Sequence, residues 1–304
     1  MKFIEKLNRF MRKGNLFPVI LIVLIAAIVA LSVGLFAKNE IDASKGAPAV
    51  EAEKTEDDTK LIINDMYLGE TTIPKFKYDI NTLDNKLFVN ENGRITYPEG
   101  FIGIDVSEHQ GDIDWQKVKD SGVDYAIIRV GYRGYTRGRL YQDEMFEKNV
   151  KGATDAGLKV GLYVFSQAVS VMEAEEEAGY ILGLIQNYNI DYPIVFDWEN
   201  ITTDDAEKAR TNAVSGAEVT QFANAFCTKI SKAGYNTAVY INKHQAYNFY
   251  DLSELAQFDI WYAEYQPLPS LYYEFSMWQY TEEGTVDGIE VPCDINVSFK
   301  DYSK

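Results

Sequence analysis

From residue 101 onward the chain alternates between short apolar runs and longer amphipathic segments. The apolar runs predict five strands, in FIGIDVS, VDYAIIRVGY, LKVGLYVFS, YPIVFDWEN and YNTAVYIN. The segments between them predict helices, in DWQKVKDSG after Asp114, over about 143–156, over about 171–188, and in GAEVTQFANAFCTKISKAG. Because these strands are apolar nearly throughout and alternate with helices, they indicate a parallel sheet covered on both faces.

Three of the predicted helices end in the same way, with DSG, DAG or KAG directly before the next apolar run. Glycine just past the last turn supplies the left-handed conformation that ends a helix. After residue 250 the spacing shortens, and FDIWYAEY, EFSMWQYT and VPCDINV predict three further strands with little helix between them. Eight strands in about 200 residues favour a closed α/β barrel, whose functional residues gather at the C-terminal ends of the strands.

The first 100 residues divide into four segments. Residues 1–15 form a basic tail, and residues 16–37 contain no charged residue over 22 positions. That length suffices to cross a hydrocarbon core of about 30 Å, so a transmembrane anchor with a cytoplasmic N-terminus is expected. A cleaved signal peptide is the alternative, although its apolar region is normally shorter. Residues 38–60 are acidic and poor in large apolar residues, which predicts a flexible stalk, and 61–100 suggest short β-hairpins with a turn at ENG.

The charge of the chain argues against nucleic acid as a partner. The 29 basic and 46 acidic residues give a formal net charge of −17, whereas phosphate binding needs a basic face. Export of residues 38–304 would permit a disulfide between Cys227 and Cys293. Both lie in apolar surroundings of the sequence, however, and two buried free thiols are the favoured interpretation.

Carboxylates recur where the predicted barrel strands end, at Asp105, Asp197, Glu199, Glu264 and Asp294, and aromatic residues accompany them. Sugar rings stack on aromatic side chains, and glycosidic cleavage needs a proton donor and an anion, so the pattern indicates a carbohydrate hydrolase. Strand alternation places Asp197 and Glu199 on one face and turns Trp198 away. The two acids should repel, so that one keeps its proton to higher pH.

Each of these features also has a plain structural interpretation. Acids at strand ends are often only solvated, and Asp105 could simply accept hydrogen bonds from backbone amides. Many of the 21 tyrosines must belong to the core. His109 and His244 have no cysteine or third histidine nearby, so they do not indicate a metal site, and no cofactor is expected.

Eight motifs occur in order over residues 101 to about 299: GIDVSEHQGDIDW, VDYAIIRVGY, VGLYVFSQA, YPIVFDWEN, KAGYNTAVYIN, IWYAEY, MWQY and CDIN. In this combination the chain resembles glycoside hydrolase family 25, the Chalaropsis-type lysozymes. The resemblance implies a TIM-like (β/α)5(β)3 barrel over residues 101–304 and cleavage of the β-1,4 bond between N-acetylmuramic acid and N-acetylglucosamine in peptidoglycan.

The resemblance also implies roles for individual residues. Glu199 is expected to be the general acid, and Asp197 the partner carboxylate that stabilises the oxocarbenium-like state or positions the substrate's acetamido group. Asp105 and Asp294 correspond to two further acids that line the site. The expected sugar contacts are Tyr163, Trp261, Tyr265 and Gln279. Val164 stands where many relatives carry a histidine or a large aromatic residue, and its position predicts a change in packing only.

The sequence therefore predicts a membrane-anchored, extracellular muramidase with peptidoglycan glycan strands as its substrate. A non-catalytic peptidoglycan-binding or scaffold protein on the same barrel is one alternative, and it would be expected to lack an essential carboxylate. A glycosidase for another amino sugar polymer, such as chitin, is the second alternative.

Overall fold

The computed structural model describes residues 53–54, 57–202 and 206–302. These residues belong to the second of two compact units, Ala49–Lys304. The predicted tail, the anchor at 16–37 and most of the stalk lie outside the described residues. Within the part that is described, none of the helices is both long and apolar enough to cross a membrane.

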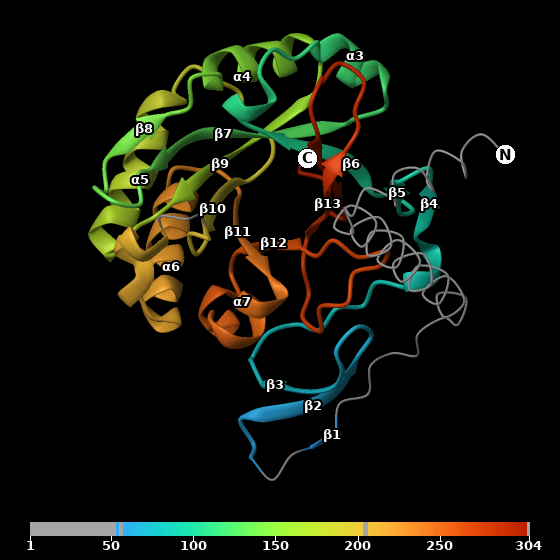
Figure 1. Cartoon of the computed structure of the whole chain (residues 1–304), viewed down its shortest axis with the longest axis vertical. Helices are drawn as coiled ribbons and strands as arrows, with labels where there is room; N and C mark the ends of the chain where they lie inside the picture. Colours follow the sequence, from blue (N-terminus) through green and yellow to red (C-terminus); the bar gives the residue numbers. More distant parts are fainter. Residues whose placement is uncertain (1–52, 55–56, 203–205, 303–304) are drawn as a thin grey trace, which may run out of the picture. The chain divides into compact units, whose positions relative to one another are not determined.

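Eight strands close into a barrel, which confirms the predicted architecture (Figure 1). Seven neighbouring strands are parallel, and β14 closes the barrel by pairing antiparallel with both β13 and β6. The barrel strands are β6 (Phe101–Val106), β7 (Tyr125–Arg133), β9 (Lys159–Ser166), β10 (Ile194–Trp198), β11 (Thr237–Asn242), β12 (Asp259–Ala263), β13 (Met277–Gly284) and β14 (Cys293–Ser298). The short strand β8 (Leu140–Gln142) extends β7 as a hairpin.

Helices connect the first six barrel strands and cover the barrel from outside, with α4, α5 and α6 along one side in Figure 1. They are α3 (Trp115–Asp120), α4 (Phe146–Asp155), α5 (Val171–Leu184), α6 (Gly216–Lys232) and α7 (Lys243–Asn248). Short 3-10 turns are η1 (Asn85–Leu87), η2 (Glu108–Gln110), η3 (Ala206–Lys208), η4 (Arg210–Ala213) and η5 (Leu252–Leu255). The last three strands are joined by loops over the described residues 264–276 and 285–292, which gives the (β/α)5(β)3 order.

Local sequence explains where the helices begin and end. Asp114 caps α3 by accepting from the backbone N–H of Lys117, and the three cap glycines, Gly122, Gly157 and Gly234, all have positive φ as predicted. Two boundaries differ from the prediction. Helix α4 begins at Phe146 because Asp143 forms a turn, accepting from the N–H of Met145, and α5 ends at Leu184 because residues 186–187 form a turn.

The alternation along each barrel strand separates two buried regions. One set of side chains fills the barrel interior, for example Tyr125, Ile127 and Val195, and the other packs against the helices. Glycine is required at position 103, because a Cβ there would lie 2.1 Å from the ring of Tyr125 inside the barrel. Asp105 lies two residues further along β6, so the same alternation turns its carboxylate into the barrel at the C-terminal end.

Two hairpins precede the barrel. Strands β2 (Lys60–Asp65) and β3 (Gly69–Pro74) form the first, with β1 (Glu53–Lys54) added at its edge. Strands β4 (Val89–Glu91) and β5 (Arg94–Thr96) form the second. Its two loop residues, Asn92 and Gly93, both have positive φ, which is the conformation that the ENG signal predicts.

Candidate active site

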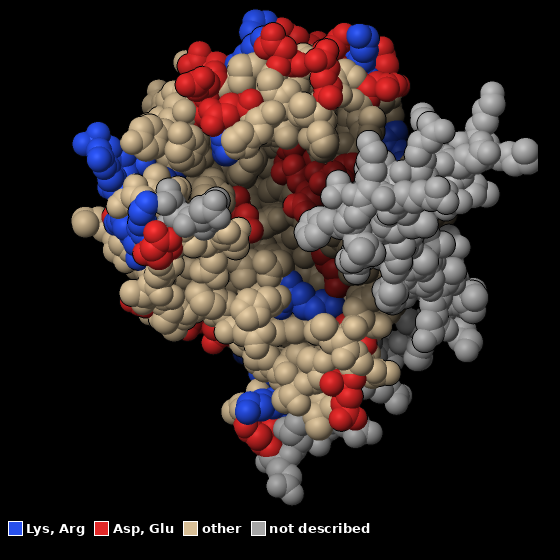
Figure 2. Space-filling view, in the orientation of Figure 1, with Lys and Arg blue, Asp and Glu red and all other residues tan. Residues whose placement is uncertain are grey.

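The strand-end acids meet at one mouth of the barrel. Asp105 lies near the end of β6 and is paired in register with Asp294 at the start of the antiparallel strand β14. Asp197 lies at the end of β10, and Glu199 follows that strand. Figure 2 shows a hollow in one face of the molecule with Asp and Glu side chains gathered inside it. The barrel topology, and not closeness in sequence, therefore brings these carboxylates together.

Asp105 is held by a chain of buried hydrogen bonds. Its Oδ2 accepts from Nε2 of Gln279 at 2.9 Å and from Nδ2 of Asn296 at 2.8 Å. The amide oxygen of Asn296 accepts from Nε1 of Trp261 at 2.7 Å. The amide oxygen of Gln279 accepts from the hydroxyls of Tyr240 at 2.7 Å and Tyr265 at 2.9 Å. Because the indole N–H of Trp261 can only donate, the amide oxygen of Asn296 faces it and the amide nitrogen is directed at Asp105. The amide nitrogen of Gln279 is likewise directed at Asp105, while its oxygen accepts from the two tyrosines.

The electrostatics of Asp105 balance two effects. Burial raises its pKa, the two amide hydrogen bonds lower it, and the nearby Glu199 raises it. The net result is a pKa of about 6. Hydrogen bonds donated to a carboxylate favour its charged form. Asp105 is therefore an oriented anion at neutral pH in a site where burial disfavours charge.

Asp197 and Glu199 differ in accessibility. Asp197 is 6% exposed, and its Oδ1 has no hydrogen-bond partner among the described residues. Burial raises its pKa well above the ordinary value, Glu199 and Asp105 raise it further, and Arg129 lowers it. Glu199 is less buried, and its pKa is raised by burial and by Asp294 and Glu282. A carboxyl group with a raised pKa keeps the proton that a general acid must donate.

The backbone after β10 is fixed by buried glutamines. Nε2 of Gln245 donates to the carbonyl of Trp198 at 2.8 Å, and Nε2 of Gln167 donates to the carbonyl of Glu199 at 2.7 Å. As predicted, Trp198 points away from the acids. It is fully buried, stacks on Phe249, and donates through Nε1 to the carbonyl of Ala168.

Asp294 and an acid that the sequence analysis missed complete the carboxylate group. Burial raises the pKa of Asp294 to about 8, and Asp105 and Glu282 contribute further. Glu282 lies at the end of β13 and affects both Glu199 and Asp294. Its place in WQYTEE, at the end of a predicted strand, was the signal that could have identified it.

Arg129 is the second residue that the sequence analysis missed. Its Nε donates to Asp143 at 2.7 Å, and its Nη2 pairs with Glu108 at 3.0 Å. Its positive charge lowers the pKa of Asp197. A lone arginine inside the apolar run YAIIRVGY was the available signal, because a buried charge needs a partner.

Two expectations from the sequence are corrected. The carboxylate of Glu264 is not part of the acidic group, because it pairs with Lys243 at 2.7 Å and accepts from Ser270. Trp261 was expected to contact sugar, but the residue is 2% exposed and its ring packs edge-on against Tyr163 and Tyr240. Its visible contribution is to orient Asn296. Tyr163 is partly buried beside the acids, Gln279 is buried, and Tyr265 is 44% exposed at the rim.

The two cysteines and the candidate metal ligands form no further site among the described residues. Cys227 and Cys293 are buried free thiols. Among the residues that the structure describes, no group of three or more His, Cys, Asp or Glu side chains is arranged to hold a metal.

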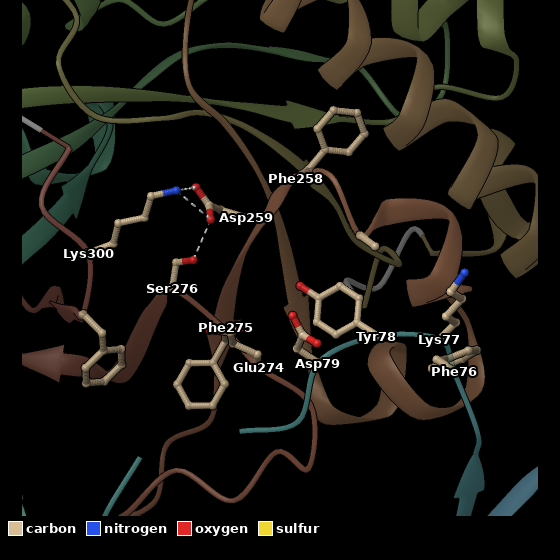
Figure 3. Close-up of a pocket in the computed structure, with 12 residues that line it drawn as sticks. Phe76, Lys77, Tyr78, Asp79, Phe258, Asp259, Glu274, Phe275, Ser276 and Lys300 are labelled. Carbon is tan, nitrogen blue, oxygen red and sulfur yellow. Dashed lines mark hydrogen bonds and ion pairs between the residues drawn. The ribbon is translucent and has the colours of Figure 1, made fainter. Parts of the chain in front are cut away.

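A pocket of about 700 Å³ lies at the other end of the barrel (Figure 3). Its lining includes Asp259 at the start of β12, Ser276 before β13, and Lys300 after the end of β14. Nζ of Lys300 pairs with Asp259 at 2.8 Å, and Ser276 donates to the same carboxylate at 2.7 Å. Because these are the N-terminal ends of the parallel strands, the pocket is separate from the acidic mouth.

A family model agrees with this barrel and its acids: residues 104–289 match the model described as "Glycosyl hydrolases family 25". The chain belongs to this family. Matches to characterised relatives include the "Autolytic lysozyme" of Clostridium acetobutylicum, 28% identical over 64% of this chain and 54% of that protein. "Lysozyme M1" of Streptomyces globisporus is 27% identical over 65% of this chain and 67% of that protein.

Solved structures of family 25 proteins share the fold. The family 25 glycosyl hydrolase of Bacillus anthracis superposes with a TM-score of 0.55 at 25% identity, covering 66% of this chain and 89% of that one. The modular autolysin LytC of Streptococcus pneumoniae gives 0.58 at 24% identity, covering 81% of this chain and 58% of that one. The chain thus spans only a little over half of the autolytic lysozyme and of LytC.

Proposed function

We propose that this family 25 protein is a peptidoglycan hydrolase of the N-acetylmuramidase type. The observation that carries the proposal is the group of four carboxylates, Asp105, Asp197, Glu199 and Asp294, at one barrel mouth, each with a raised pKa. Acids whose charges are mutually unfavourable can share protons, which provides both a proton donor and an anion at one pH. The relatives named as lysozymes support peptidoglycan as the substrate.

Glu199 is assigned as the general acid. It is the more accessible member of the D-x-E pair, and its raised pKa favours the protonated form that a general acid needs. It donates this proton to the glycosidic oxygen while the bond from that oxygen to the anomeric carbon breaks. Water then adds to the anomeric carbon, and the proton that the water releases returns to a carboxylate.

Asp197 and Asp105 are assigned to the developing positive charge. The unpaired Oδ1 of Asp197 can accept a hydrogen bond from the N–H of the substrate's acetamido group. The anion of Asp105 is fixed by the two amides, so it needs no reorganisation when positive charge forms on the sugar. Asp294 and the partly exposed Tyr265 are assigned to contacts with the flanking sugars, because both are accessible at the mouth.

We further propose that residues 16–37 anchor the chain in the cell membrane with the barrel outside the cell. The support is the uncharged length of that segment and the basic residues before it. In the alternative of a cleaved signal, the same barrel would be secreted.

Product analysis distinguishes the candidate functions. The full-length chain is incubated with purified peptidoglycan, and the products are reduced with borohydride and analysed by mass spectrometry. Muramitol at the new ends is the expected result. Glucosaminitol ends would indicate a different bond specificity. No release at all would favour the non-catalytic scaffold, against which the complete set of four carboxylates argues.

A further inference from the structure

The tip of the first hairpin has an unusual composition for a turn. Between Asp65 and Gly69 lie Met66, Tyr67 and Leu68, with exposed fractions of 41%, 37% and 57%. Turns of this kind normally carry polar residues or glycine, because nothing covers them. Three successive apolar side chains at an exposed tip therefore indicate a surface that is covered by a partner.

Ion pairs and hydrogen bonds hold the tip against the rim of the barrel mouth. Nζ of Lys243, which follows β11, binds Asp65 at 2.8 Å and Glu264 at 2.7 Å. The hydroxyl of Tyr67 donates to the carbonyl of Leu268 at 3.0 Å and accepts from the N–H of the same residue at 3.2 Å. Both Lys243 and Glu264 follow the C-terminal ends of barrel strands, so the tip lies on the same face as the acids.

Tyr265 connects this tip with the carboxylates. It directly follows Glu264, which binds the hairpin through Lys243, and its own hydroxyl donates to Gln279, which holds Asp105. Tyr265 is 44% exposed. Met66, Tyr67, Leu68 and Tyr265 are thus exposed on the same rim and are here together called the rim strip, with Tyr265 beside the acidic site and the other three on the hairpin tip.

The charges around the rim strip indicate its occupant. Lys243, a cation at its base, is already paired with two carboxylates, and the neighbouring Glu70 is exposed. This surface offers no free positive charge from these residues, so it does not suit an anionic membrane surface. The rings of Tyr67 and Tyr265 and the side chains of Met66 and Leu68 offer apolar surface to a neutral amphipathic ligand, and N-acetylated sugars have this character.

We propose that the rim strip binds the glycan strand of peptidoglycan beyond the sugars that flank the cleaved bond. This inference rests on the proposed function and adds an outer subsite to it. The hairpin precedes residues 104–289, so three of the four residues of the rim strip, all except Tyr265, come from outside the segment that matches the family. A glycan strand that is bound along the rim strip can bring several of its glycosidic bonds to Glu199 in turn.

The test compares long and short substrates for the full-length chain. The variant carries Met66→Ser and Leu68→Ser, since neither side chain makes a hydrogen bond, and Leu87→Ser, 44% exposed in η1, is the matched control. We expect the double variant to raise KM for polymeric glycan strands roughly three- to tenfold with kcat unchanged. Its kinetics on a tetrasaccharide of alternating N-acetylglucosamine and N-acetylmuramic acid should equal those of the unaltered chain.

Two results would overturn the inference. One is an unchanged KM on polymeric strands, and the other is an equal loss on the tetrasaccharide, which would show a general disturbance of the site. Failure of the proposed function is recognised separately, because the unaltered chain would then release no muramitol ends from either substrate, and the assignment of the rim strip would fall with it.

Discussion

Replacing Asn296 with leucine should move the pH dependence of activity. The substitution keeps the shape of the side chain but removes the hydrogen bond from Nδ2 to Asp105, which is 2.8 Å long and fully buried. A hydrogen bond to a charged group is worth about 1.5–3 kcal/mol, and about 1.4 kcal/mol corresponds to tenfold in an ionisation equilibrium. Because this bond favours the anion, its loss raises the pKa of Asp105.

If catalysis needs the Asp105 anion, the acidic limb of the profile of kcat/KM against pH should move upward by about one to two pH units. Circular dichroism checks that the variant is folded, because the indole N–H of Trp261 loses its acceptor. Trp261→Phe is the control: it removes the outer bond only, so a smaller displacement is expected. An unmoved acidic limb in a folded Asn296→Leu variant would refute the proposed role of Asp105.

Three further predictions concern Asp294, the lysine that binds the hairpin, and Trp198. Asp294→Asn should be more stable than the unaltered chain at pH 8 by at least about 1 kcal/mol and equal to it near pH 4, because a carboxyl whose pKa is raised to about 8 destabilises the fold above its ordinary pKa. Urea unfolding at both pH values measures the difference in stability, and a difference that does not change with pH would contradict the prediction. Lys243→Met should cost about 3–5 kcal/mol of unfolding free energy by leaving Asp65 and Glu264 unpaired, with Lys229→Met, an exposed lysine on α6, as the control whose loss should be far smaller. Trp198→Phe should lower the free energy of unfolding by about 1–3 kcal/mol, because the carbonyl of Ala168 loses its donor and the ring is smaller. The KM should be unchanged, and a raised KM would show that Trp198 contacts substrate.

The barrel could be predicted from the sequence because its signals are local and repeated. Apolar runs, cap residues such as Asp114, and the three cap glycines each act within a few residues of their own position. Strand alternation alone placed Asp197 toward the site and Trp198 away from it. These properties depend on backbone geometry, which short stretches of sequence specify.

The remaining features depend on contacts between distant parts of the chain. The roles of Glu264 and Trp261 were predicted wrongly because a position at a strand end does not reveal which residue the side chain contacts. Glu264 forms an ion pair with Lys243, and Trp261 is enclosed by Asn296 and the neighbouring rings. The hydrogen bonds that orient Asp105 link residues 174 and 191 positions apart. Such contacts are fixed by closure of the barrel and leave no local pattern.

The most direct test of the central claim is the rate at which Glu199→Gln releases reducing ends from purified peptidoglycan, relative to the unaltered chain at the same pH. General acid catalysis contributes about 10²–10⁴-fold, so we predict a loss of at least about a hundredfold, with an unchanged circular dichroism spectrum and retained binding to insoluble peptidoglycan. Release at the rate of the unaltered chain would contradict the assignment of Glu199 and, with it, the proposed catalytic site.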